Sequence, residues 1–187
     1  MRAILVASVL ALSACGQSTT QQAAQSACAI TATHALTWTN AETPDLVTAT
    51  SQGPSCAQAI VTLVGVNASG DPLWAFSSTY YDMTAGGPPP EDAPPANADD
   101  VRSFLESWAN VTTMQSSTLP EWRADAATLT ESADTFSYDT PMPREAYEML
   151  RARDLPMVCY AVAVEGAQCL IIDPATGSPT PMVAYGP

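Results

Sequence analysis

Apolar and polar residues alternate along the first part of the chain. Between residues 28 and 39, one face carries Ile30, Ala32, His34, Leu36 and Trp38, and the other carries mostly threonines. This alternation predicts a β-strand that buries one face. Three further strands are predicted at residues 45–51, 57–66 and 73–81, and the nearly continuous apolar content of the third indicates a central position in a sheet.

A change of composition at residues 85–96 ends this strand region. The segment contains five prolines, which lack the amide donors of helices and sheets, so it is predicted to be a loop. A helix should follow, because Asn97 is a favourable N-cap and an apolar stripe then recurs at helical spacing. The stripe consists of Val101, Phe104, Leu105, Trp108 and Val111.

Two shorter helices and a group of strands complete the expected fold. One helix is predicted from Pro120 and another after Thr140-Pro141, and strands are predicted at residues 157–164, 167–173 and 181–185. The pattern favours one α+β domain over residues 28–187, with a largely antiparallel sheet of about six to seven strands and two to three helices on one face.

The N-terminus has the pattern of an export signal. Arg2 precedes a short apolar run, which ends in Leu12-Ser13-Ala14-Cys15. These four residues resemble the lipobox of bacterial lipoprotein precursors. The resemblance implies a diacylglycerol on the Cys15 thiol, cleavage before Cys15, and acylation of the new amino group. An ordinary signal peptide with an incidental cysteine, or an apolar start to a cytosolic protein, is the alternative interpretation.

This resemblance divides the chain into a signal at residues 1–14, a lipidated and polar tether at 15–27, and the folded domain. Gly16 follows the cysteine where an aspartate would, by the same resemblance, favour the inner membrane. We therefore expect an outer-membrane protein facing the periplasm, with the inner membrane as the alternative. Its three acyl chains exceed the two membrane signals needed for stable anchoring.

The chain is strongly acidic, with six arginines and no lysine against nineteen carboxylates. After residue 14, five cations remain, and the net charge is −14. Such a charge disfavours binding to nucleic acid or to anionic lipid, whereas a cationic protein is a plausible partner. Five carboxylates around the proline-rich loop are candidate partner-binding residues, with simple solubility as the alternative role: Asp82, Glu91, Asp92, Asp99 and Asp100.

Four cysteines remain after Cys15, an even number that suggests two disulfides in an oxidising compartment. We favour Cys28–Cys56 with Cys159–Cys169. A two-residue Glu165-Gly166 turn would place Cys159 and Cys169 on opposite sides of their hairpin. A three-residue loop would make them diagonal neighbours on one side, which is marginal for a disulfide.

The sequence contains few residues suited to catalysis. His34 is the only histidine and lies on an apolar face, so we expect a buried structural residue, with a hydrolase that uses His34 as the alternative. The tryptophans and the Tyr80-Tyr81 pair are predicted to be core residues rather than a ligand groove. No metal or cofactor is expected, because no spaced ligand motif is present.

These observations favour a lipid-anchored envelope protein that acts as a non-enzymatic binding or structural module. Two versions of this function are open. The protein could be an accessory subunit of an envelope complex, docking its partner through the proline-rich loop or an exposed sheet edge. Alternatively, it could be an acidic inhibitor or trap for a cationic envelope protein.

Overall fold

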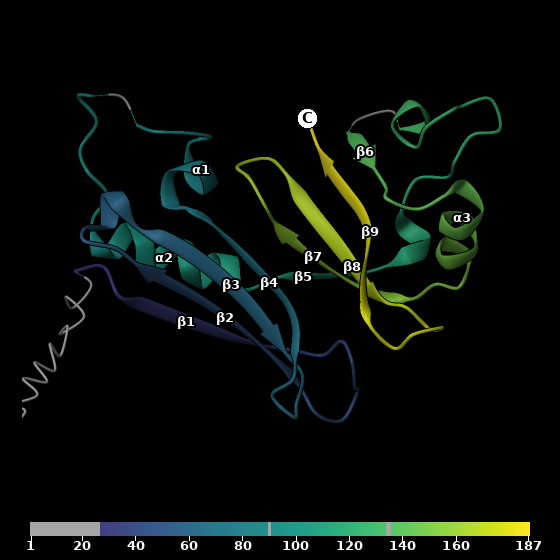
Figure 1. Cartoon of the computed structure of the whole chain (residues 1–187), viewed down its shortest axis with the longest axis horizontal. Helices are drawn as coiled ribbons and strands as arrows, with labels where there is room; N and C mark the ends of the chain where they lie inside the picture. The colour runs from purple at the N-terminus through teal and green to yellow at the C-terminus, as the bar shows by residue number, and fades with distance from the viewer. Residues whose placement is uncertain (1–26, 90, 134–135) are drawn as a thin grey trace, which may run out of the picture.

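The computed structural model describes residues 27–89, 91–133 and 136–187, and its strands form two antiparallel sheets (Figure 1). In the first sheet each strand pairs with the next along the chain, in the order β1-β2-β3-β4. Its strands are β1 (Ile30–Leu36), β2 (Asp45–Gln52), β3 (Ile60–Val66) and β4 (Pro72–Thr79). The four strands predicted in this region are therefore confirmed, and β3 lies inside the sheet as its apolar content indicates.

The two faces of the first sheet differ in their surroundings. One face is buried, and alternate residues of β2 and β3, such as Val47, Ala49 and Leu63, have no exposed surface. Gly65 is required on this face, because the ring of Trp74 lies across it and would overlap a Cβ at that position. The residues between these positions lie on an outer face that ranges from half-buried to exposed.

The second sheet has the order β5-β7-β8-β9-β6. Its middle strands are buried on both faces, as four consecutive buried residues of β7, from Met157 to Tyr160, show. Such strands are continuously apolar rather than alternating. The strands are β5 (Thr112–Gln115), β6 (Ser137–Asp139), β7 (Pro156–Ala161), β8 (Ala167–Ile172) and β9 (Pro179–Gly186).

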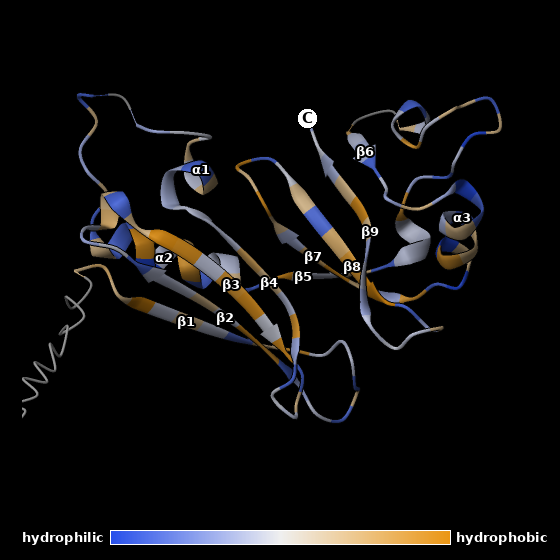
Figure 2. Cartoon of the chain, in the orientation of Figure 1, coloured by the Kyte–Doolittle hydropathy of each residue, from blue (hydrophilic) through white to orange (hydrophobic). Residues whose placement is uncertain are grey.

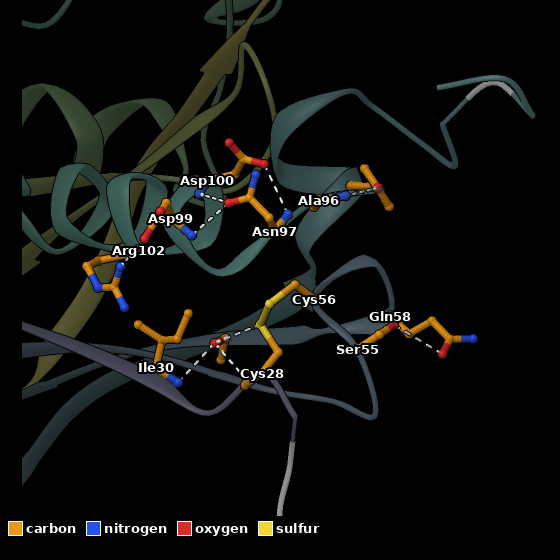
Figure 3. The surroundings of a disulfide bond; sticks show 12 residues. Cys28, Ile30, Ser55, Cys56, Gln58, Ala96, Asn97, Asp99, Asp100 and Arg102 are labelled. Atoms are coloured by element: carbon orange, nitrogen blue, oxygen red, sulfur yellow. Dashed lines mark hydrogen bonds and ion pairs between the residues drawn. A yellow bond between two sulfur atoms is a disulfide. The ribbon is translucent and has the colours of Figure 1, made fainter. Parts of the chain in front are cut away.

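Three α-helices accompany the sheets: α1 (Tyr80–Thr84), α2 (Ala98–Ala109) and α3 (Arg144–Ala152). The predicted N-cap of α2 is confirmed, since the Asn97 side chain accepts hydrogen bonds from the amides of Asp99 and Asp100. The carboxylate of Asp100 accepts one from the Asn97 amide in return, which completes a capping box (Figure 3). Short 3₁₀ turns occur at Cys56–Gln58, Ser116–Thr118 and Thr130–Ser132.

The helix α2 packs against β1 and β2 of the first sheet, on the buried face. Its residues Val101, Leu105 and Trp108 are buried, as the apolar stripe predicted. In the hydropathy colouring, the orange positions of β3 belong partly to this covered face and partly to the outer face (Figure 2). The apolar content of β3 therefore exceeds what its single buried face requires.

One hydrophobic core joins the two sheets. Trp74 of β4 stacks on Tyr160 of β7, with ring centroids 5.9 Å apart. The indole nitrogen of Trp108 donates to the carbonyl of Ala161 at 3.0 Å. A second cluster of buried residues fills the opposite side of the second sheet, where Tyr147 and Leu150 of α3 contribute. The second sheet is thus the central layer of the molecule.

The structure confirms the α+β class, and it divides the strands between two sheets where the sequence suggested one. The short strands β5 and β6 were not predicted. The pair Tyr80-Tyr81, assigned to the end of a strand, instead begins α1, because the Thr79 hydroxyl accepts the Asp82 amide and caps a helix there.

The prediction of a helix from Pro120 is wrong. Two carbonyl groups of this segment accept hydrogen bonds from side chains of α3. Tyr147 donates to the carbonyl of Pro120 at 2.7 Å, and Arg144 donates to that of Trp122 at 3.0 Å. These two carbonyl groups therefore accept side-chain donors in place of the backbone donors of a helix. The apolar positions Ala126 and Leu129 are buried nonetheless, so the segment contributes to the core as a turn-rich chain.

Candidate functional site

The five acidic residues proposed for partner binding have unequal roles in the structure. Asp100 belongs to the capping box of α2, and Asp99 forms an ion pair with Arg102 (Figure 3). Asp82 accepts a hydrogen bond from the hydroxyl of Thr79 at the start of α1. Anionic groups are favourable at helix N-termini. The positions of these three carboxylates at the starts of α1 and α2 therefore explain them without a partner protein.

Glu91 and Asp92 remain as the exposed carboxylates of the proline-rich loop. Both are exposed, and neither forms a hydrogen bond or ion pair with another described residue. The loop projects beyond α1 and α2 (Figure 1). These two carboxylates are therefore accessible to a cationic partner.

His34 is exposed, so the prediction of a buried structural histidine is wrong. The alternation placed it correctly on the face directed toward the core, since its cross-strand neighbour is the fully buried Val47. However, β1 is an edge strand, and the edge leaves the imidazole open to solvent. It makes no hydrogen bond to another side chain in the described part of the protein, and it lines none of the described pockets.

A disulfide joins Cys28 and Cys56, as predicted (Figure 3). Cys28 precedes β1, and Cys56 begins the turn before β3, so the bond holds the start of the edge strand against the sheet interior. Beside it, the buried hydroxyl of Ser51 donates to the carbonyl of Cys28 at 3.0 Å and accepts the amide of Ile30 at 3.3 Å. The first residues of β1 are thereby fixed in position.

The second disulfide, Cys159–Cys169, also forms as predicted, although both hairpin loops considered for it were wrong. Ala161 pairs with Ala167, so five residues connect β7 and β8. In this register Cys159 lies directly opposite Cys169, with the Cα atoms 4.0 Å apart. The diagonal geometry that made the bond marginal does not occur.

The lipidation residue Cys15, the signal at 1–14 and nearly all of the tether at 15–27 lie outside the described residues. Within the described residues, none of the helices has both the length and the apolar character needed to cross a membrane. The same part of the chain contains no group of three His, Cys, Asp or Glu side chains arranged to hold a metal ion.

The outer face of the first sheet is the largest feature that the sequence analysis did not single out. Cross-strand pairing aligns Thr31, Thr50, Thr62 and Ser77 in one row of hydroxyl groups. The neighbouring row contains Thr33, Thr48, Val64 and Ala75. Two large apolar side chains on this face, Leu46 and Ile60, are 42% and 48% exposed. No strand residue of this face is charged, in a protein whose net charge after residue 14 is −14.

The face ends at β1, whose outer edge pairs with no other strand of the described chain. Its seven residues pair with β2 without a register shift and include neither proline nor a charged residue. Proteins ordinarily protect such edges with charges, prolines, bulges or short strands. This edge has none of these devices.

Each of the other three sheet edges is protected by at least one of these devices. At the far side of the first sheet, β4 begins with Pro72, and its pairing with β3 shifts register near Gly65. In the second sheet, the edge strands β5 and β6 contain only four and three residues. The exposed edge of β1 is therefore distinctive within this molecule.

The aromatic residues pack mainly in the core, as predicted. Trp38, Trp74, Trp108 and Tyr80 are buried, while Trp122 is half-buried. Burial raises the pKa of the Tyr160 phenol, and burial together with the nearby Asp100 carboxylate raises that of Tyr80. Both groups stay neutral at physiological pH.

A pocket of about 390 Å³ beside Trp108 is lined by residues of α2 and β7, among others. Its lining contains no carboxylate, histidine or cationic side chain.

The fold and the outer face of the first sheet define an α+β protein built on two antiparallel sheets, with two disulfides and one open sheet edge. Comparisons with protein-family models, with curated proteins and with solved structures found no match for this chain.

Proposed function

We propose that this protein is a lipid-anchored component of a bacterial cell envelope, attached through Cys15 to the outer membrane and facing the periplasm. The support comes from Leu12-Ser13-Ala14-Cys15, which resembles a lipobox, and from the two disulfides, which persist in oxidising compartments. In this position the folded part serves as a binding or structural module for another envelope protein.

The observation that carries the binding role is the uncharged outer surface of the first sheet and its open edge at β1. The acidic charge of this protein is distributed over its other strands, helices and loops, yet it spares this surface. An exposed surface with apolar side chains and free backbone groups is costly to maintain in a secreted protein, and it is a common site of partner binding. This favours the accessory-subunit version of the function.

The acidic trap is the second candidate, and Glu91 and Asp92 favour it. Both project on the proline-rich loop without an ion-pair partner among the described residues, so they could steer a cationic protein toward the molecule. The two candidates differ in their salt dependence. Steering by exposed carboxylates weakens when the Debye length falls from about 10 Å at 0.1 M to about 3 Å at 1 M salt, whereas backbone and apolar contacts persist.

The anchor is tested by labelling cells with radioactive palmitate. Cys15→Ser should abolish labelling and release the protein from the membrane fraction, while Ser18→Ala, three residues further along, should leave both unchanged. Labelling that survives in Cys15→Ser would refute the anchor.

The binding role is tested by crosslinking the anchored protein in living cells and identifying attached peptides by mass spectrometry. A specific partner should be recovered from the wild type at both salt concentrations used for washing. Recovery that is lost at 1 M salt, and lost on changing Glu91 and Asp92 to Gln and Asn, would instead identify the acidic trap.

A further inference from the structure

We propose that the edge of β1 binds an extended, positively charged segment of a partner protein and adds it to the first sheet as a fifth strand. This inference rests on the proposed binding role and specifies the chemistry of the partner. Strand addition of this kind derives its affinity from backbone hydrogen bonds and its selectivity from alternate side chains.

The backbone of β1 supplies the necessary groups. Just before the β1–β2 ladder, the amide of Cys28 donates to the carbonyl of Gly53, and the same register then continues unbroken from Ile30 to Leu36. Because backbone groups alternate in direction along a strand, Thr31, Thr33 and Ala35 direct their N–H and C=O groups away from β2. Three donors and three acceptors therefore point outward along the open edge.

Rigidity makes these groups suitable for binding. The Cys28–Cys56 disulfide and the bonds of Ser51 fix the start of β1, and the pairing with β2 fixes the rest. At the end of the strand, the buried carboxylate of Asp45 accepts the amides of Trp38 and Thr39. A partner strand would meet an edge that needs little ordering, which lowers the entropic cost of binding.

Charge decides between the two obvious occupants of this edge. A second copy could pair its own β1 with this one, but each copy carries a net charge of −14 after residue 14, and like charges slow the encounter. A cationic segment gains from the same field. Charge complementarity therefore favours a basic segment over self-association.

The helix α2 adds a specific feature on one side of the edge. Its Phe104 packs on Tyr80 of α1, so that flank of the helix faces β4. The other flank carries Arg102, which lies beside Ile30 of β1 in Figure 3, and Glu106 follows one turn further on. Arg102 is paired with Asp99, whereas Glu106 is exposed and forms no ion pair with another described residue.

The two sides of the added strand would thus differ. Its side chains toward α2 would lie beside Ala32 and His34, where a lysine stem can cover apolar surface while its ammonium approaches Glu106. Side chains on the opposite side would extend the rows that end in Thr31 and Thr33, where small β-branched residues fit. Alternating basic and threonine-like residues match both sides.

A blocked nine-residue peptide of alternating lysine and threonine is the probe. Its binding to the full-length chain, purified in detergent, is measured by calorimetry. A peptide of the same sequence with N-methyl groups on alternate amides cannot complete the ladder and should bind at least tenfold more weakly. A peptide with glutamate in place of lysine should not bind. Equal binding of the lysine peptide and its N-methylated form would overturn strand addition, because charge alone would then explain the affinity.

Variants of the edge test the same point from the protein side. Thr33→Pro removes an outward N–H while leaving the ladder to β2 intact, as prolines at sheet edges do, and should weaken binding at least tenfold. Thr33→Val keeps the N–H and should bind within twofold of the wild type. Glu106→Gln should weaken binding severalfold at low salt and not at 1 M salt. Unchanged binding by Thr33→Pro, with both disulfides and the near-ultraviolet spectrum intact, would also refute the proposal.

Two further outcomes would assign the edge to another occupant. Slow hydrogen exchange of the Thr31, Thr33 and Ala35 amides in the free protein would show that the edge is already covered. A concentration-dependent dimer that the lysine peptide dissociates would show that a second copy covers it. Either result overturns the inference and leaves the envelope-binding function standing, since that function is judged by palmitate labelling and by crosslinked partners.

Discussion

The two sheets of this protein bury their surfaces in different ways. The first has one face against α2 and the second sheet, and its β2 alternates regularly between buried and exposed or half-buried residues. The second lies between two hydrophobic clusters, and the middle of its β7 is continuously buried. The second sheet is therefore covered on both sides, whereas the outer face of the first is left available for binding.

β3 shows that apolar composition does not by itself reveal which kind of sheet a strand joins. Its Val61 and Leu63 are fully buried, whereas Ile60 on the outer face is 48% exposed. A strand with apolar residues on both faces is expected to be covered on both sides. Here one side is open, and this surplus of apolar surface supports the proposed binding role.

The largest expected effect comes from the helix that lies where the two sheets meet. Trp108→Ala should lower the free energy of unfolding by roughly 3–5 kcal/mol, because the indole is buried and donates to the carbonyl of Ala161. Trp122→Ala is the control, since this half-buried side chain donates within its own loop, to Ala126, and should cost less. Urea unfolding measures both. Equal midpoints for Trp108→Ala and the wild type would contradict the joint core.

An isoleucine pair compares the two sheets directly. Ile171→Ala in the doubly covered sheet should cost about 2–5 kcal/mol, because this side chain has no exposed surface. Ile60→Ala on the open face should cost less than about 1 kcal/mol. If the two substitutions had similar effects on urea unfolding, the outer face of the first sheet would be covered in solution.

The two disulfides provide the next comparison. In the chain-entropy model, the Cys28–Cys56 bond, which spans 28 residues, should contribute about 3–4 kcal/mol, and the Cys159–Cys169 bond, which spans 10, about 3 kcal/mol. Each pair is replaced by alanines and the variant unfolded in urea. A greater loss from the second pair would show that packing of its sulfur atoms, rather than loop length, dominates.

The smallest effect concerns a buried phenol in the cluster beneath the second sheet. Burial raises the pKa of Tyr147 above its ordinary value, so the folded state favours the neutral form. This stabilisation is complete below the unfolded pKa of about 10 and is lost as the pH rises above it. Tyr147→Phe should cost about 1–2 kcal/mol at pH 7, where the bond to the Pro120 carbonyl is lost. Its stability should then decline less steeply above pH 10, and equal slopes would contradict the assignment.

Much of the local structure was predictable because short-range chemistry determines it. Asn97 caps α2 through its own side chain, and the stripe from Val101 to Trp108 has helical spacing. The Pro120 segment was not predictable in this way. Its backbone bonds to Arg144 and Tyr147, which are more than twenty residues away along the chain.

The candidate site was predicted only in part. An exposed sheet edge was among the expected docking elements, but nothing in the sequence identified β1 as that edge. His34 illustrates the reason: alternation determines which face a residue occupies, while strand order determines whether that face is covered. Likewise, Asp99 and Asp100 were candidates for partner binding, yet their contacts with Arg102 and Asn97 already account for them.

The sequence by itself determined the strand and helix periods, the N-cap of α2 and the acidic balance, because each depends on neighbouring residues or on composition, and it favoured the two disulfides that form. Only the tertiary structure decided that the strands divide into two sheets, that Cys159 lies directly opposite Cys169, and that β1 is an open edge. Those outcomes depend on contacts between distant segments. The free energy of such contacts comes from burial shared by both segments, which no local pattern records.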